Sequence, residues 1–319
     1  MGRHHAAAIA RAGGALVAVV DPDLERAHSH AGGGLAVRSL AELDVPIDVV
    51  HVCAPLGEHG ALAEQALALG AHLVVEKPLA PDAATTAALL AAAEEKGLLL
   101  VPVHQFLFQP GIQRLLASRD RFDPLVRCVF TAGTAGAERT GVDPDGLVAD
   151  ILPHPLALFS RFAPEAFAGL EWLTVRPGPG ELRALAVSEG TTFEIVVSTR
   201  ARPTHATLDL VGTRATAHAD LFHGFASVER GAATRARKVT RPFTLAGSML
   251  LRAGGNLATR AATRELAYPG LRELVRRTYD AIGDGVPAPI EGRETLAVAV
   301  ARDAIITAAG APAPGRTPL

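Results

Sequence analysis

The first hundred residues alternate short apolar runs with stretches of helical periodicity, and this alternation is the strongest limit on the fold of the chain. Short β-branched runs are typical of buried parallel strands, and they predict strands over residues 15–20, 45–54, 72–75 and 98–103. The segments between them predict helices over residues 24–31, 59–69 and 82–96. A βαβ alternation of this kind predicts a doubly wound parallel sheet whose ligand site lies at the carboxyl ends of the strands.

The remainder of the chain has a different pattern. Short runs joined by Gly-containing links predict an antiparallel meander, with strands over residues 125–134, 171–176, 182–187, 192–199, 205–211, 216–220 and 225–229. Helices are predicted over residues 109–118, 270–282 and 293–309, and another is predicted to begin near Asp150. This grouping indicates an α+β domain with its sheet covered on one face. We place the boundary near Pro102, so that residues 1–102 and residues 103–319 form the two domains.

Composition excludes several classes of protein. A formal net charge of -2 over 319 residues gives no electrostatic argument for binding nucleic acid or an anionic membrane. The only cysteines, Cys53 and Cys128, lie in apolar runs and indicate core residues, so we expect no disulfide framework and no metal site. No apolar run has the length of a membrane helix and no signal peptide is recognisable, so we expect a soluble cytoplasmic protein.

Glu76-Lys77-Pro78 follows the apolar run at residues 72–75. Lys77 is one of three lysines in a chain that otherwise uses arginine, and it stands where a buried strand opens into a loop. Partial desolvation there favours a role in proton transfer. The alternative is a lysine at a strand end that extends its charge into water.

These residues also carry a family resemblance. Asp48-Val49-Val50, Cys53-Ala54-Pro55, His59 and the block from Ala66 to Ala80 with its Glu-Lys-Pro resemble the Gfo/Idh/MocA oxidoreductases. The resemblance implies an N-terminal Rossmann domain, a C-terminal α+β domain with an open sheet, and NAD(P)-dependent hydride transfer to or from a sugar-like or polyol substrate. It implies these cofactor-binding residues: Gly2, Asp21, Ala54, Pro55, His59, Glu76, Lys77 and Gln105.

A second block, Gly146 to Pro155, resembles the entry to the family helix that carries an Asp-x-x-x-His pair. Asp150 and His154 are four residues apart, so on one helix they share a face. His154 is suited to take a hydroxyl proton as hydride leaves, and Asp150 to orient the substrate. Whether Lys77 or His154 is the main base is left open. The alternative makes Asp150 an N-cap and His154 a helix-start residue. Many relatives have a further acid where this chain has Ala157, so contacts made by that acid are not expected here.

Asp21 ends the first predicted strand, at the position of the acid that binds the adenosine ribose in dinucleotide folds. A carboxylate accepts from the 2′-hydroxyl and repels a 2′-phosphate, so it favours NAD over NADP. The alternative is a turn residue, because Asp21-Pro22-Asp23 is also a good turn sequence.

The glycine-rich loop of a dinucleotide fold is incomplete. Gly2 stands at the place of its third glycine, while the first strand and the first two glycines are missing, which predicts a cleft between the strands at residues 16–20 and 49–53. Either the true start lies upstream, which we favour, or the protein is a truncated paralogue. The second case supports a non-catalytic homologue that binds a ligand or oligomerises.

The remaining candidates are minor. Gln105 is expected to contact the carboxamide or a sugar hydroxyl, whereas His218, Asp220 and His223 are interpreted as sheet residues. Residues 234–241 are interpreted as a basic solvated loop that weakly suggests a phosphate-bearing substrate, and residues 243–267 as a lid or an oligomer contact. We expect a homodimer or homotetramer formed through the C-terminal sheet.

Overall fold

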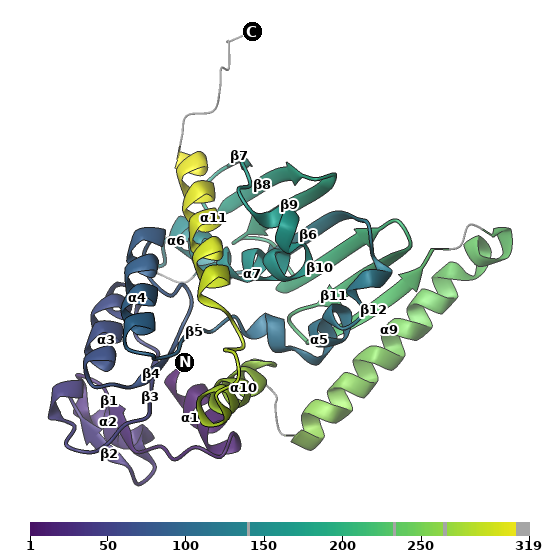
Figure 1. The fold of residues 1–319 in the computed structure, drawn as a ribbon. Helices are drawn as coiled ribbons and strands as arrows, with labels where there is room; N and C mark the ends of the chain where they lie inside the picture. Colours follow the sequence, from purple (N-terminus) through teal and green to yellow (C-terminus); the bar gives the residue numbers. More distant parts are fainter. Residues whose placement is uncertain (139–140, 232–233, 264–266, 311–319) are drawn as a thin grey trace. The chain divides into compact units, whose positions relative to one another are not determined.

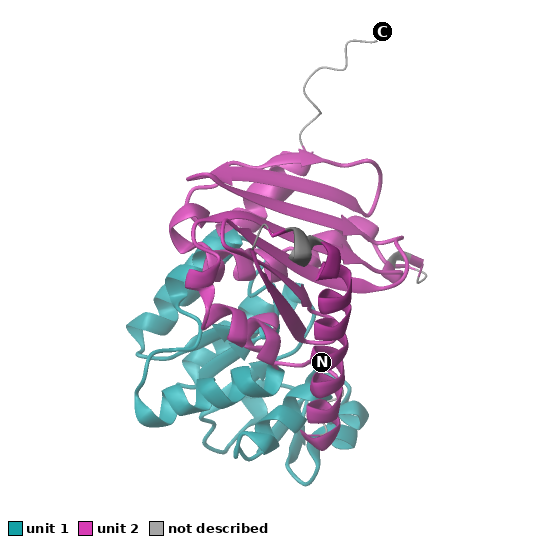
Figure 2. Cartoon of the chain, turned by 90° about the vertical axis from the view of Figure 1, so that its right-hand side faces the viewer, with its two compact units in different colours: residues 1–105, 271–299 teal, residues 106–270, 300–319 magenta. Residues whose placement is uncertain are grey.

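The computed structural model describes residues 1–138, 141–231, 234–263 and 267–310. The chain divides into two compact units, which are described separately (Figures 1 and 2). Unit 1 comprises Met1–Gln105 and Leu271–Ala299, and unit 2 comprises Phe106–Gly270 and Val300–Leu319. The division passes through helix α11 (Gly292–Gly310). The boundary near Pro102 stays a prediction.

Unit 1 contains parallel strands alternating with helices, which confirms the Rossmann-type reading of the first hundred residues (Figure 1). Its strands are β1 (Ala18–Val20), β2 (Leu35–Val37), β3 (Val49–Val52), β4 (His72–Val75) and β5 (Leu100–Pro102). Its helices are α1 (Gly2–Arg11), α2 (Leu24–Ala31), α3 (Leu56–Ala68), α4 (Ala83–Glu95) and α10 (Leu271–Asp284). The strand β2 has no counterpart in the sequence-based prediction.

The parallel strands of unit 1 form two ladders. One contains β1 and β2, the other has the order β3-β4-β5, and within the described ranges no hydrogen-bonded ladder joins β1 to β3. Apolar side chains from β4, α3 and α4 pack into one cluster in which Leu73, Val75 and Leu67 are fully or almost fully buried. The carboxylate of Asp82 accepts the N–H of Thr85 at 2.7 Å, which confirms it as the N-cap of α4.

Unit 2 is built on a seven-stranded sheet with the order β12-β11-β10-β6-β9-β8-β7. Its strands are β6 (Leu125–Gly133), β7 (Leu173–Val175), β8 (Glu181–Ser188), β9 (Thr191–Ser198), β10 (His205–Gly212), β11 (Ala215–Asp220) and β12 (Phe225–Arg230). All seven predicted strands are present. The meander prediction is wrong in one respect, because β6 lies between β9 and β10 and pairs with β9 in parallel.

The core of unit 2 lies on one face of this sheet. The helices of the unit are α5 (Pro110–Leu116), α6 (Pro144–Ile151), α7 (Pro153–Phe162), α8 (Pro164–Phe167) and α9 (Arg235–Thr263). Phe159 of α7 and Phe193 of β9 have ring centroids 5.4 Å apart, and both residues are fully buried. Alternate residues of β9 are buried, as a sheet covered on one face requires. The α+β prediction is therefore confirmed.

Helix α9 differs from the sequence-based expectation. Residues 234–241 were interpreted as a loop, which is wrong, because Arg235–Thr263 forms one 29-residue helix. The role of residues 243–267 as a lid or an oligomer contact stays a prediction, and residues 264–266 lie outside the described residues. Its Arg241 pairs with Glu229 of β12 at 2.7 Å. Arginines and small residues throughout this segment make it polar overall, which conceals its helical potential. Among the described helices, α9 included, none is both long and apolar enough to cross a membrane.

Candidate active site

In unit 1, the candidate residues lie where the parallel strands end. Asp21 follows β1, Ala54 and Pro55 follow β3 closely, and Glu76 and Lys77 follow β4. The carboxyl ends of parallel strands meet at one edge of a sheet, which is where α/β proteins bind ligands. Each ladder of unit 1 therefore presents polar groups at its carboxyl edge.

Lys77 is half-buried at the end of β4. The following residue, Pro78, is tied to the loop after β3 by His59, which is 2 % exposed. The His59 ring lies between two backbone carbonyls, with Nδ1 2.9 Å from the Pro78 oxygen and Nε2 2.9 Å from the Ala54 oxygen. The predicted cofactor residues Ala54 and His59 are therefore part of the scaffold that holds the Lys77 turn, and Pro55 precedes α3.

Glu76 is 8 % exposed, although it carries a carboxylate. One carboxylate oxygen lies 3.1 Å from Nε2 of His5 on α1, and the other accepts the backbone N–H of Lys77 at 3.3 Å. A buried carboxylate needs such partners to offset the loss of its hydration. Burial, followed by the charge of Glu76, raises the pKa of the Cys53 thiol to about 12. Cys53 is therefore a neutral thiol beside this carboxylate.

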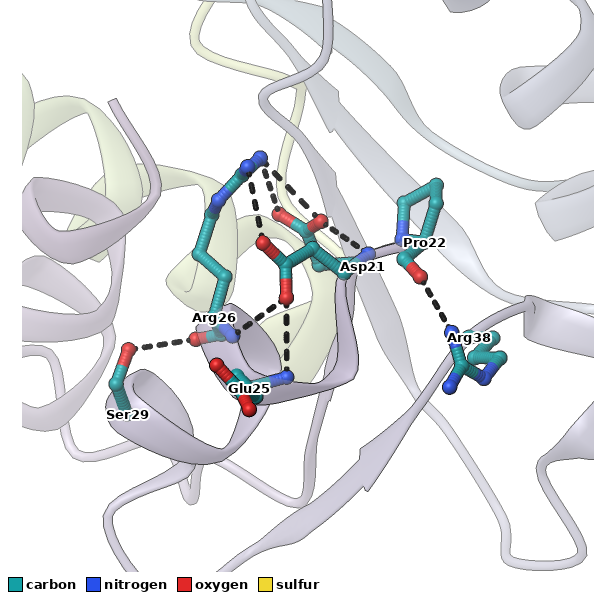
Figure 3. Close-up of polar contacts among 7 residues, drawn as sticks. Asp21, Pro22, Glu25, Arg26, Ser29 and Arg38 are labelled. Carbon is teal, nitrogen blue, oxygen red and sulfur yellow. Dashed lines mark hydrogen bonds and ion pairs between the residues drawn. The ribbon is translucent and has the colours of Figure 1, made fainter.

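Asp21 is partly buried, and Figure 3 shows its surroundings. Its carboxylate accepts the backbone N–H of Asp23 at 2.9 Å, as in the turn predicted from Asp-Pro-Asp. The guanidinium of Arg26 lies 3.4 Å from both carboxylate oxygens, and Arg38 donates to the Pro22 carbonyl at 2.8 Å (Figure 3). The turn role and a ribose-binding role are compatible, because a carboxylate can accept about four hydrogen bonds.

Two further observations on unit 1 bear on a dinucleotide. The side-chain oxygen of Gln105 is buried and has no hydrogen-bond partner among the described residues. An orphaned amide oxygen is costly unless a donor reaches it, and a carboxamide or sugar hydroxyl would supply one. A Cβ on Gly2 would meet no described atom within 4 Å, so packing does not require glycine there. These residues fit a nicotinamide dinucleotide.

In unit 2, Asp150 lies in the last turn of α6 and His154 in the first turn of α7. The structure corrects two expectations. The N-cap of α6 is Asp143, whose carboxylate accepts from the backbone N–H groups of Asp145 and Gly146. Asp150 is therefore not a capping residue. The pair also does not lie on one uninterrupted helix, because the helix is divided at Leu152.

The division has a covalent cause. Pro153 has no N–H, so the carbonyl of Ala149 receives no hydrogen bond from the residue four positions later. Arg302 of α11, which is 7 % exposed, donates its Nε to this carbonyl at 3.3 Å. A cation at the end of a helix also interacts favourably with the helix dipole. Sequence reasoning missed Arg302, although an arginine inside the apolar run Ala297 to Ile306 was a usable signal.

One face of the His154 ring is covered by a residue of the segment that follows β5. Its ring stacks on Phe106 with a centroid distance of 4.3 Å and an interplanar angle of 26°. Phe106 belongs to the short 3₁₀ helix Gln105–Phe108. Ala157, where many relatives have an acid, is buried.

The histidines of the sheet form pairs of their own. His218 of β11 lies 2.7 Å from the carboxylate of its cross-strand partner Asp209, and His223 lies 2.7 Å from Asp220. The hydrogen bond that the His218 ring donates to the Asp209 carboxylate is the main cause that raises the pKa of His218. These contacts agree with the reading of His218, Asp220 and His223 as residues of the sheet and its turn.

Comparison with known proteins identifies the family of the N-terminal third. Residues 1–104 match the Gfo/Idh/MocA family, described as an oxidoreductase family with an NAD-binding Rossmann fold. This part of the chain is a Gfo/Idh/MocA NAD-binding domain. Among curated family relatives, UDP-N-acetylglucosamine 3-dehydrogenase of Acidithiobacillus ferrooxidans is 34% identical over 121 residues, covering 36% of this chain and 37% of that enzyme. A dTDP-3,4-didehydro-2,6-dideoxy-alpha-D-glucose 3-reductase of Streptomyces violaceoruber is 41% identical over 124 residues, covering 36% of this chain and 35% of the reductase.

The sequence alignments thus span little more than a third of these relatives. Solved structures of other proteins match nearly the whole chain. The A. ferrooxidans dehydrogenase superposes with a TM-score of 0.76 at 20% identity, covering 97% of this chain and 94% of that one. A levoglucosan dehydrogenase in complex with NADH superposes with a TM-score of 0.77 at 15% identity over the same shares, 97% and 94%. At these identities the match shows the fold.

Proposed function

We propose that this chain is an NAD-dependent dehydrogenase or reductase that moves a hydride between the nicotinamide and a carbon of a sugar or polyol. The observation that carries the proposal is the row of polar residues at the carboxyl ends of the strands of unit 1. Asp21 is assigned to the adenosine ribose, and Gln105 and Glu76 to the nicotinamide half. The names of three relatives support the class of substrate, because two name nucleotide-linked sugars and the third names inositol, a polyol.

Each unit supplies its own part of the chemistry. When bound, the nicotinamide accepts a hydride from the carbon that carries the hydroxyl. The protein has to hold that hydroxyl and take its proton, and Lys77 is assigned as the base that polarises or deprotonates it. In unit 2, His154 is the partner or alternative base, and Asp150 orients a neighbouring hydroxyl. Arg302 and Phe106 keep this pair in place through the contacts described above.

The substrate is proposed at the level of a class. Two of the relatives described above act, by their names, on sugars linked to a nucleoside diphosphate. A third structure is named a levoglucosan dehydrogenase, and this substrate has no nucleotide in its name. We therefore propose free and nucleotide-linked sugars as the two sets to screen first, with polyols as a third.

NADH binding separates an enzyme from the non-catalytic alternative. Titration of the purified chain, followed by nicotinamide fluorescence or calorimetry, should give saturable binding, and a screen of sugars and polyols with NAD should give NADH at 340 nm. A chain that binds a sugar but neither form of the dinucleotide would act as a ligand-binding protein. The family match and the named activities of the relatives do not favour that alternative.

The preference for NAD is tested at Asp21. Asp21→Asn removes the charge but keeps the size of the side chain, and we expect the Kd for NADH to rise ~10-fold or more, since a hydrogen bond to a charged group contributes roughly 1.5–3 kcal/mol. The Kd for NADPH should fall relative to that for NADH, because Arg26 then loses one of its two anionic partners, keeping only Asp23, and is freer to face the 2′-phosphate. Glu25→Gln removes an exposed charge from α2, the helix that contains Arg26, and serves as the control. An unchanged NADH to NADPH ratio in Asp21→Asn would remove Asp21 from the cofactor site.

For assembly, we propose that a second copy of the chain covers the open face of the unit 2 sheet. Leu173, Val175 and Val187 are 73%, 61% and 65% exposed on β7 and β8. Large apolar side chains gathered on one edge of a sheet indicate a surface that binds another protein. The same face carries both Arg183 and Glu194, so two copies related by a twofold axis can pair opposite charges.

Sedimentation velocity tests this assembly. Leu173→Asp combined with Val187→Asp should shift the chain to a smaller species, because the substitutions place charges in an apolar contact. Val286→Asp, at an exposed apolar residue of unit 1, is the matched control and should leave the sedimentation coefficient unchanged. If the double variant sediments as the wild type does, the sheet face is not the interface.

A further inference from the structure

A continuous chain of hydrogen bonds within unit 1 ends at Glu76. The hydroxyl of Tyr279 on α10 lies 3.0 Å from Nε2 of His51 on β3. Nδ1 of His51 lies 2.9 Å from Nδ1 of His5 on α1, and Nε2 of His5 lies 3.1 Å from the Glu76 carboxylate. Four elements distant in sequence thus contribute one titratable group each.

The chain runs from a partly exposed residue into the interior. Tyr279 is partly exposed, whereas His5 is 2 % exposed. Burial raises the pKa of Tyr279 to about 12, so its hydroxyl keeps its proton at neutral pH. Burial, followed by the charge of His5, lowers the pKa of His51 to about 3, so this ring is neutral. The Tyr279 ring packs against the backbone of Gly14, where a Cβ would lie 2.7 Å from the Cε2 atom of the ring.

The geometry admits two complete sets of hydrogen bonds with neutral imidazoles. In the first, Tyr279 donates to His51 Nε2, His51 Nδ1–H donates to His5, and His5 Nε2–H donates to ionised Glu76. In the second, every donor is reversed: protonated Glu76 donates to His5, His5 Nδ1–H donates to His51, and His51 Nε2–H donates to Tyr279. The two sets use the same heavy-atom positions.

One proton converts the first set into the second. A proton from water binds the Tyr279 oxygen, and the original hydroxyl proton moves to His51 Nε2. The Nδ1 proton of His51 then moves to His5 Nδ1, and the Nε2 proton of His5 moves to Glu76. Tyr279, His51 and His5 each gain one proton and pass one on, so the net change is one proton transferred from water to the carboxylate. The reverse sequence returns it.

We propose that His51 and His5 form a proton relay that exchanges protons between water at Tyr279 and the carboxyl group of Glu76. The relay sets the charge beside the Lys77 backbone, which Glu76 contacts directly. Its use in turnover rests on the proposed function, because oxidation of a hydroxyl releases one proton and reduction of a carbonyl consumes one. His5, His51 and Tyr279 are positioning residues, since they act through Glu76.

The hydrogen bond between the two rings can be tested without activity. In the full chain labelled with ¹⁵N-histidine, a scalar coupling between Nδ1 of His5 and Nδ1 of His51 should be detected, because one N–H bridges them. Tyr279→Phe should change the ¹⁵N shifts of His51, while Tyr268→Phe, at the other tyrosine of the chain, should leave them unchanged. Absence of the coupling in the folded wild type would overturn the relay.

A proton inventory tests its use. Measured in mixtures of H₂O and D₂O, kcat of the wild type should give a curved plot, because several protons move in one step. Tyr279→Phe should give a straight plot and lower kcat about 10²-fold, the lower end of the range for general acid–base groups. His51→Gln keeps a polar side chain but cannot pass a proton on, so it should also lower kcat and give a straight plot. A variant with lower kcat but unchanged curvature would show a structural role only and reject the relay. If no substrate is turned over while the coupling is present, the proposed function fails and the relay stands.

Discussion

Lys77→Met is expected to lower kcat/KM by ~10²–10⁴-fold, the usual contribution of a general acid or base. Methionine keeps the length of the half-buried side chain and removes its ammonium group, so the fold should be retained. Lys77→Arg separates two roles, because arginine keeps the charge but does not lose its proton. Activity restored by arginine would mean that Lys77 provides charge, and inactivity would mean that it transfers a proton. Initial rates of NADH formation give the answer.

The matched control is Lys96→Met, which removes an exposed lysine that follows α4 in the same unit. It should turn over as the wild type does. His154→Gln, measured in parallel over a range of pH, decides which base dominates, since loss of the principal base removes the corresponding limb of the pH profile. Near-normal turnover in both Lys77→Met and His154→Gln would exclude the proposed chemistry.

Phe193→Ala is expected to lower the free energy of unfolding by about 3–5 kcal/mol, the usual cost of truncating a buried aromatic residue. Phe193 has no exposed surface, and its ring centroid lies 5.4 Å from that of Phe159 and 6.3 Å from that of Phe167. The truncation leaves a cavity between the sheet and the helices on its covered face. Urea denaturation followed by circular dichroism measures the change.

Phe222→Ala makes the same chemical change at a residue that is 54% exposed. A surface substitution of this kind should cost less than about 1 kcal/mol. If the two variants unfold at the same urea concentration, the core of unit 2 is not organised around Phe193.

Much of the fold could be predicted because local chemistry determines it. The period-2 pattern of residues 192–199 and the cap at Asp82 identified β9 and α4. The position of β6 between β9 and β10 could not be predicted, because strand order depends on contacts between residues far apart in sequence. Helix α9 was missed for another reason: arginines and small residues make this segment polar overall, so it was interpreted as a loop in its first part.

The candidate site was predictable only where residues are close in sequence. Glu76 and Lys77 were identified from their place at a strand end, and the roles assigned to them stay predictions. The two histidines that link Glu76 to Tyr279 were not identified from the sequence, because nothing in the sequence relates position 5 to positions 51 and 279. Arg302 was missed likewise, since its partner, the Ala149 carbonyl, becomes available only because of Pro153.

The central position of β6 has a consequence for the order in which unit 2 can fold. This strand is the first of its sheet to leave the ribosome, yet its partners arrive much later: Arg127 pairs with Thr192, 65 residues onward (192 − 127), and with Val211, 84 residues onward (211 − 127). Closing such long loops costs entropy before any strand pairing repays it. During synthesis β6 therefore has to remain unpaired until β9 and β10 have emerged, and its apolar residues, Cys128 and Phe130 among them, need protection from aggregation in that interval.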